Sequence, residues 1–123
     1  MRALVVDDSR AMRLILRRML REVGFEVFEA SNGREALEVL QEIGKPDLIL
    51  VDWNMPEMNG FEFICAVRAN QSFDNILMMM VTTETEMTQV VKALDAGVNE
   101  YVMKPFTKEV ILEKLDLMGI ARS

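Results

Sequence analysis

Histidine is absent from the sequence, and cysteine occurs once, as Cys65. Without histidine the chain offers no histidine-based triad and no imidazole ligand for a metal. A single cysteine excludes an internal disulfide and suits a reducing compartment. No apolar stretch approaches the roughly 20 residues of a membrane span, and no signal peptide precedes the first apolar run. We therefore expect a cytoplasmic protein with no membrane anchor.

Basic residues are also in the minority. Lysine and arginine total 14 against 20 acidic residues, which gives a net charge of −6. This balance argues against nucleic acid as a direct partner, because a phosphate backbone would be repelled. The length of 123 residues and the 50% hydrophobic and 28% charged composition are typical of one globular domain.

Short apolar runs alternate with helical periods five times along the chain. The runs carry apolar residues on both sides and predict buried strands at Ala3–Val6, Glu26–Ala30, Leu48–Val51, Ile76–Val81 and Tyr101–Met103. Apolar residues spaced by three and four predict five helices, the first two ending near Gly24 and Gly44 and the others at 61–69, 87–96 and 108–118. In the fourth helix the spacing places Val90, Val91 and Leu94 toward the core. The alternation predicts a flavodoxin-like, doubly wound α/β fold with a five-stranded parallel sheet in the order 2-1-3-4-5 and five helices.

Four of these strands lead into residues suited to phosphate or magnesium chemistry. They are Asp7 with Asp8, Asp52, Thr82, and Lys104. The carboxyl ends of parallel strands lie on one edge of the sheet, where open α/β sheets bind ligands. In the expected order the first and third strands are neighbours at the topological switch point. We therefore expect three carboxylates, a hydroxyl and an ammonium group to meet in one pocket.

Three carboxylates in one pocket repel one another and require a positive partner. Mg²⁺ prefers oxygen ligands, and it would neutralise phosphoryl oxygens while a carboxylate attacks phosphorus in line. The central Asp52 is the candidate nucleophile, and Asp7 and Asp8 are candidate metal ligands. Lys104 and Thr82 are candidate partners of phosphate oxygens. Each residue taken singly also fits a structural role, such as a helix cap or a strand end, but their convergence favours the chemical interpretation.

Four segments resemble the signature segments of bacterial response-regulator receiver domains, and most closely those of single-domain chemotaxis regulators: VVDDS, VDWNMPEMNG, VTTE and YVMKPF. The resemblance implies that Asp52 is the phosphoacceptor. It implies that Asp8, Asp52 and the backbone carbonyl of Asn54 bind Mg²⁺ and that Asp7 assists through water.

The resemblance extends to signal output. It implies that Thr82 and Tyr101 form a switch pair, that Lys104 contacts the phosphate, and that the Lys104–Pro105 peptide bond is cis. Tyr101 and Lys114 would lie on an output face formed by the fourth helix, the fifth strand and the fifth helix. The chain ends just past its fifth helix, so we expect a receiver domain over residues 1–123 that has no output domain and acts by protein contact.

The expected function is a phosphoaspartate switch of a two-component system. It would accept a phosphoryl group from a histidine kinase and catalyse its own magnesium-dependent phosphoryl transfer and dephosphorylation, without being an enzyme for external substrates. The expected target of this monomer is the flagellar motor switch protein or another protein, and a phosphatase is a further candidate partner. A phosphorelay intermediate or a stand-alone regulator of another process is the alternative.

Two other classes fit the sequence less well. A phosphatase with an aspartyl nucleophile would need a second carboxylate two residues after Asp52, where Asn54 stands. A flavin-binding module would need a hydroxyl- and glycine-rich loop after the first strand, where the acidic segment DDSRAM would repel the flavin phosphate.

Arginines recur on one expected face of the first helix, at Arg10, Arg13, Arg17 and Arg21. A solvated outer face and a docking surface for an acidic partner, such as the phosphodonor, both fit this pattern.

Overall fold

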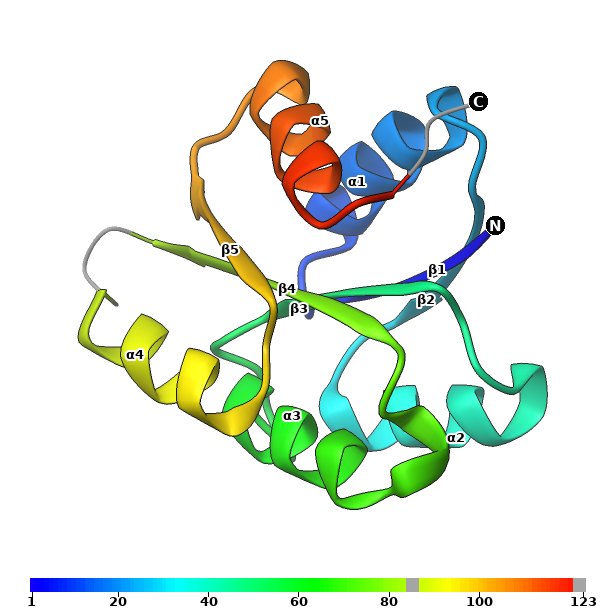
Figure 1. The fold of residues 1–123 in the computed structure, drawn as a ribbon, viewed down its shortest axis with the longest axis vertical. Coiled ribbons are helices and arrows are strands. Elements are labelled where there is room, and N and C mark those ends of the chain that lie inside the picture. Colours follow the sequence, from blue (N-terminus) through cyan, green and yellow to red (C-terminus); the bar gives the residue numbers. More distant parts are fainter. Residues whose placement is uncertain (84–86, 121–123) are drawn as a thin grey trace.

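The computed structural model describes residues 1–83 and 87–120. Its centre is a five-stranded parallel sheet in the order β2-β1-β3-β4-β5 (Figure 1). The strands are β1 (Arg2–Val6), β2 (Glu26–Ala30), β3 (Leu48–Asp52), β4 (Leu77–Thr83) and β5 (Glu100–Lys104). The helices are α1 (Arg10–Glu22), α2 (Gly33–Ile43), α3 (Gly60–Ala69), α4 (Met87–Ala96) and α5 (Lys108–Leu117), with a short 3₁₀ helix at Gln71–Phe73. The predicted fold class and strand order are confirmed.

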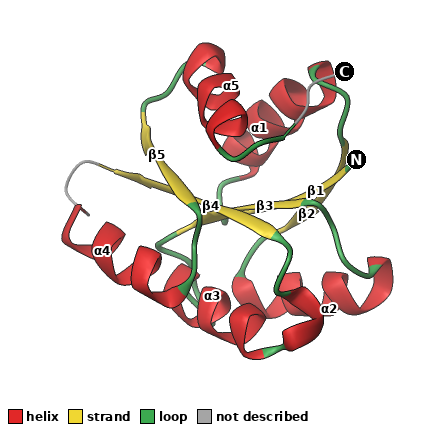
Figure 2. Ribbon diagram, in the orientation of Figure 1, coloured by secondary structure: helices red, strands yellow, loops and turns green. Residues whose placement is uncertain are grey.

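Helices cover both faces of the sheet, with α1 and α5 on one face and α2, α3 and α4 on the other (Figure 2). Successive strand residues point to opposite faces, so Val5 and Leu50 pack toward α1 and α5, whereas Leu4 and Val51 pack toward the other helices. This double coverage explains why the central strands have continuous apolar runs. Within the described residues, no helix combines the length and apolar character needed to cross a membrane.

Four of the helices, α1, α2, α3 and α5, begin at polar caps that lie after the strand ends. The side chains of Ser9, Asn32, Asn59 and Thr107 each accept a hydrogen bond from a backbone amide in the first turn of their helix. Short strand-to-helix connections therefore lie along the carboxyl edge of the sheet, where the candidate site residues are. The Lys104–Pro105 peptide bond at this edge is cis, which confirms the prediction.

The orientation of α4 differs from the prediction. Val90 is 4% exposed and Ala93 is fully buried, whereas Val91 is 61% and Leu94 43% exposed. The expectation that Val91 and Leu94 face the core is therefore wrong. α4 lies beside α3 toward the β5 edge of the sheet (Figure 2), and it buries only a narrow stripe with a spacing of three residues. The positions next to that stripe face solvent although they are apolar.

We predict that Val90→Ala lowers the free energy of unfolding by about 1 to 3 kcal/mol, because it removes buried methyl groups and leaves a cavity. Val91→Ala, the matched control one residue along the helix, should change it by no more than about 0.5 kcal/mol. Urea unfolding of the two variants measures both effects. Equal losses would show that this orientation of α4 is incorrect.

Candidate functional site

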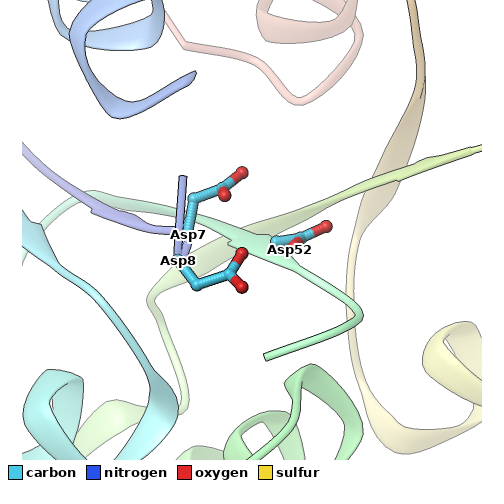
Figure 3. A group of neighbouring side chains, drawn as sticks. All are labelled: Asp7, Asp8 and Asp52. Atoms are coloured by element: carbon cyan, nitrogen blue, oxygen red, sulfur yellow. The ribbon is translucent and has the colours of Figure 1, made fainter. Parts of the chain in front are cut away.

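Three carboxylates gather where β1 and β3 end (Figure 3). Asp7 and Asp8 follow β1, and Asp52 is the last residue of β3. One oxygen from each side chain lies within 4.8 Å of the others. Asp7 and Asp52 are buried, with exposures of 1% and 8%, whereas Asp8 is exposed. From the ends of β1 and β3 the chain leaves toward opposite faces of the sheet, into α1 and α3, which opens the crevice that the strand order predicted.

Lys104 reaches these carboxylates from β5, two strands away from β3. Its Nζ lies 3.3 Å from Asp52 Oδ1 and 3.4 Å from Asp7 Oδ2. The backbone amide of Ser9 donates a hydrogen bond to the other oxygen of Asp7, at 2.8 Å. One ammonium group is thus shared between two of the three carboxylates, and the cluster keeps an excess of negative charge.

Burial and the excess of negative charge together raise the pKa of Asp52. Burial and the neighbouring Asp7 raise the pKa of Asp52 to about 6, although the charge of Lys104 opposes the rise. Burial alone would lower the pKa of Lys104, but its attraction to Asp52 and Asp7 outweighs this effect and raises it. Lys104 therefore stays charged at neutral pH, and the ionised Asp52 carboxylate carries a free-energy cost until further positive charge enters the site.

The residues present fit a hard divalent cation. The donor set consists of carboxylate oxygens, the ligands that Mg²⁺ prefers, and a dication would supply the positive charge that Asp52 lacks. Asn54, whose backbone carbonyl is also a predicted metal ligand, lies in the loop between β3 and α3, and its side chain is exposed. Its role as a ligand stays a prediction.

The predicted switch residues lie on the two strands beyond β3. Thr82 is fully buried and comes one residue after Val81, the β4 partner of Asp52. Its hydroxyl lies 3.4 Å from the carbonyl oxygen of Thr83. Tyr101 on β5 is half-buried opposite Met80.

Lys114 of α5 lies against the Tyr101 side chain. The Lys114 Nζ is 4.8 Å from the centre of the Tyr101 ring and 3.1 Å from Glu100 Oε1. Glu84, the last residue of the VTTE segment, lies outside the described residues. The functional roles of these side chains stay predictions.

Two arginines of α1 make contacts that the sequence did not predict. Arg13 Nη1 donates to the backbone oxygen of Asp7 at 2.6 Å, and Arg13 Nε lies 3.2 Å from Glu29 Oε1. Arg17 Nη1 lies 2.9 Å from the other oxygen of Glu29. The expectation that all four arginines form a free outer face is therefore wrong for Arg13 and Arg17, which connect α1 to β2. Glu29, a charge within an otherwise apolar strand end, was the available signal.

Comparisons with known proteins agree with this arrangement. The family model for the response regulator receiver domain matches residues 3–116. The chain is 46% identical over 119 residues to chemotaxis protein CheY1 of Helicobacter pylori, covering 96% of each chain. It is 43% identical over 117 residues to chemotaxis protein CheY of Pseudomonas aeruginosa, covering 94% of each. The solved structure of the chemotaxis response regulator CheY4 of Vibrio cholerae matches with a TM-score of 0.87 at 37% identity, over 94% of this chain and 96% of that one.

The raised pKa of Asp52 predicts that Asp52→Asn stabilises the metal-free protein at pH 8, by about 1 to 3 kcal/mol. The folded state disfavours the ionised carboxylate, so the cost is complete above a pH of about 6 and disappears as the pH falls toward 3.8, the ordinary pKa. Urea unfolding between pH 8 and pH 4 should show the gap closing on acidification.

Asp95→Asn, a change at an exposed carboxylate of α4, provides the control. A gap between Asp52→Asn and the wild type that does not depend on pH, or a less stable Asp52→Asn protein at pH 8, would contradict this electrostatic account.

Proposed function

The chain belongs to the family of response regulator receiver domains, and we propose that it is a phosphorylation-controlled switch whose acceptor is Asp52. Receiver domains are phosphoacceptors of two-component systems and bind Mg²⁺ at an acidic pocket. CheY-like receivers take phosphate from histidine kinases and act on other proteins. The observation that carries the proposal is the position of Asp52 at the switch point of the sheet, within 4.8 Å of Asp7 and Asp8 and 3.3 Å from the Lys104 ammonium.

In the proposed reaction an oxygen of Asp52 attacks the phosphorus of the kinase phosphohistidine. The phosphorus–nitrogen bond breaks, the electron pair stays on the imidazole, and an acyl phosphate forms on Asp52. Asp8, Asp52 and the Asn54 carbonyl would hold Mg²⁺, with Asp7 assisting through water, and the bound ion would supply positive charge that neutralises the phosphoryl oxygens in the transition state. Lys104 is already in contact with Asp52 and would move to a phosphoryl oxygen, because that oxygen carries more negative charge than the carboxyl oxygens of the acyl phosphate.

The proposed response begins at Thr82, whose hydroxyl would donate a hydrogen bond to the phosphoryl group. Movement of Thr82 at the end of β4 would release space for Tyr101 on the adjacent strand. Tyr101 and Lys114 both line a groove of about 320 Å³ between β5 and α5, together with Phe106 and Val110. This groove is our candidate for the part of the surface whose affinity for a target changes.

Similarity to chemotaxis proteins favours the flagellar motor switch protein as the target. A phosphorelay intermediate or a regulator of another process is the second candidate. We further propose that the protein acts in the cytoplasm as a monomer, without nucleic acid or membrane contact. The phosphoryl group on Asp52 would be removed by magnesium-dependent self-catalysed hydrolysis and by a phosphatase partner.

We expect acetyl phosphate to label the wild-type protein once, at Asp52, and only when Mg²⁺ is present. Asp52→Asn keeps the shape of the side chain but removes the nucleophile, so labelling measured by intact-protein mass spectrometry should disappear. Asp95→Asn should be labelled like the wild type. Undiminished labelling of Asp52→Asn, or labelling in excess chelator, would refute the proposed acceptor chemistry.

A second expectation separates the output face from the donor face. Tyr101→Ala and Lys114→Ala should keep phosphorylation rates within about twofold but weaken binding of the phosphorylated protein to the flagellar motor switch protein. Arg10→Glu and Arg21→Glu, at exposed positions of α1, should slow transfer from the histidine kinase by about threefold to tenfold at low salt and less at high salt.

Two controls make this separation specific. Labelling by acetyl phosphate, which needs no docking, should be unchanged in the α1 variants, and Arg34→Glu on α2 should leave kinase transfer unchanged. Loss of phosphotransfer in Tyr101→Ala with intact target binding would reverse the assignment of the two faces.

A further inference from the structure

The loop between β3 and α3, residues 53–59, is fixed tightly against the acceptor strand at its α3 end. The backbone amide of Gly60 donates to the Trp53 carbonyl at 2.9 Å. A Cβ atom on Gly60 would lie 2.4 Å from the carbonyl oxygen of Asp52 and 2.9 Å from the Cα of Trp53. Both neighbours are backbone atoms, which cannot rotate away. Any side chain at Gly60 must therefore displace either α3 or the peptide of Asp52.

The other side of the 53–59 loop is fixed by the start of α2. The amide of Gly33 donates to the Met58 carbonyl at 3.2 Å, and a Cβ on Gly33 would lie 2.9 Å from that oxygen and 2.7 Å from Met58 Cγ. Beside this contact, Asn32 Nδ2 donates to Glu57 Oε2 at 3.1 Å. Glu57 has a φ of 63°, a conformation that residues with a side chain adopt only when their surroundings hold them there.

The segment just before Gly33 also contacts the residue that follows β1. The amide of Asp7 donates to the carbonyl of Ala30, the last residue of β2, at 3.1 Å. Three residues later, Gly33 contacts the 53–59 loop. Segment 30–33 is therefore hydrogen-bonded to two other backbone segments of the acidic site. One is the segment that carries Asp7, and the other is the 53–59 loop that follows Asp52.

We propose that Gly33 and Gly60 are positioning residues of the acidic site, because they set the separation of Asp52 from Asp7 and Asp8 on which cation binding depends. The inference rests on the proposed magnesium-dependent function, but it also concerns the metal-free protein. Groups that orient metal ligands from behind typically change metal affinity by about 10- to 100-fold when they are altered. Gly60 abuts the Asp52 peptide directly, so its substitution should have the larger effect.

The test compares Gly33→Ala and Gly60→Ala with Gly44→Ala. Gly44 ends α2 with a φ of +78°, so alanine is strained there, but a Cβ would meet nothing within 4 Å. Mg²⁺ titrations followed by Trp53 emission should show an affinity about tenfold lower for Gly60→Ala and severalfold lower for Gly33→Ala. Gly44→Ala should keep the wild-type affinity although its urea midpoint falls. This contrast separates positioning from general destabilisation.

A metal-free measurement and a rescue complete the test. Without Mg²⁺, ¹H–¹⁵N spectra should show displaced amide signals of Asp7, Asp52 and Trp53 in Gly33→Ala but not in Gly44→Ala. Met58→Ala removes the Cγ that a Cβ at Gly33 would meet, so the double variant should regain part of the lost affinity.

Each outcome decides for or against the proposal. If Gly60→Ala does not fold, the Mg²⁺ affinities of Gly33→Ala and of the double variant with Met58→Ala test the proposal. Folded Gly33→Ala with wild-type Mg²⁺ affinity and unshifted site amides overturns the inference, as does an equal loss of affinity in Gly44→Ala. A wild-type protein that binds no Mg²⁺ would refute the proposed function, whereas the metal-free spectra would still decide whether the two glycines position the site.

Discussion

The Lys104 ammonium is the only positive group of the described residues that contacts the carboxylate side chains of the acidic site, and it contacts both Asp7 and Asp52. This contact brings an ammonium group from β5 to carboxylates that follow β1 and end β3. The contact therefore requires that all the intervening strands keep their register. One ammonium cannot balance three carboxylates, and the pKa of about 6 at Asp52 shows that the folded state tolerates an unfavourable charge there. A cost of about 3 kcal/mol at most is large against a typical domain stability of about 5 to 15 kcal/mol, so the apolar packing on the two faces of the sheet must offset it.

That charge imbalance would also give the proposed phosphorylation a route to the rest of the domain. The Lys104 ammonium contacts both Asp7 and Asp52, so a new anionic group at Asp52 would change its preferred position. Thr83 pairs with Lys104 across β4 and β5, and Tyr101 lies three residues earlier on the same strand. Tyr101 in turn contacts Lys114, which binds Glu100. A short chain of contacts thus joins the acidic site to α5, through an element that two ligation states would bias differently.

The sequence predicts the positions of strands well where burial on both faces produces continuous apolar runs, as in β1 and β3. It also predicts the gathering of Asp7, Asp8 and Asp52, because parallel strands bring their ends to one edge. It fails on the α4 face, where the apolar Val91 and Leu94 look like core residues although the helix buries only one stripe. It fails too where contacts depend on lateral distances between elements, such as the arginines of α1 bound to Glu29, or on close approach of backbones, such as Gly60 against Asp52. The close approach of backbones leaves no local pattern in the sequence, and the arginine contacts leave only the charge of Glu29 in β2.

The strand order separates a rigid half of the site from an adjustable one. β1 and β3 have a neighbouring strand on each side, and the loop after Asp52 is held by α2 and α3 and by the packing of Trp53 on Phe61, whose ring centres are 5.8 Å apart. β5 has a neighbour on one side only, and its residues other than Val102 are partly or well exposed. The free energy needed to displace backbone is therefore lower at β5 than at β1 or β3. If Asp52 is the acceptor, as proposed, a change of charge there should be expressed as movement at this edge, because β3 is held by a neighbouring strand on each side.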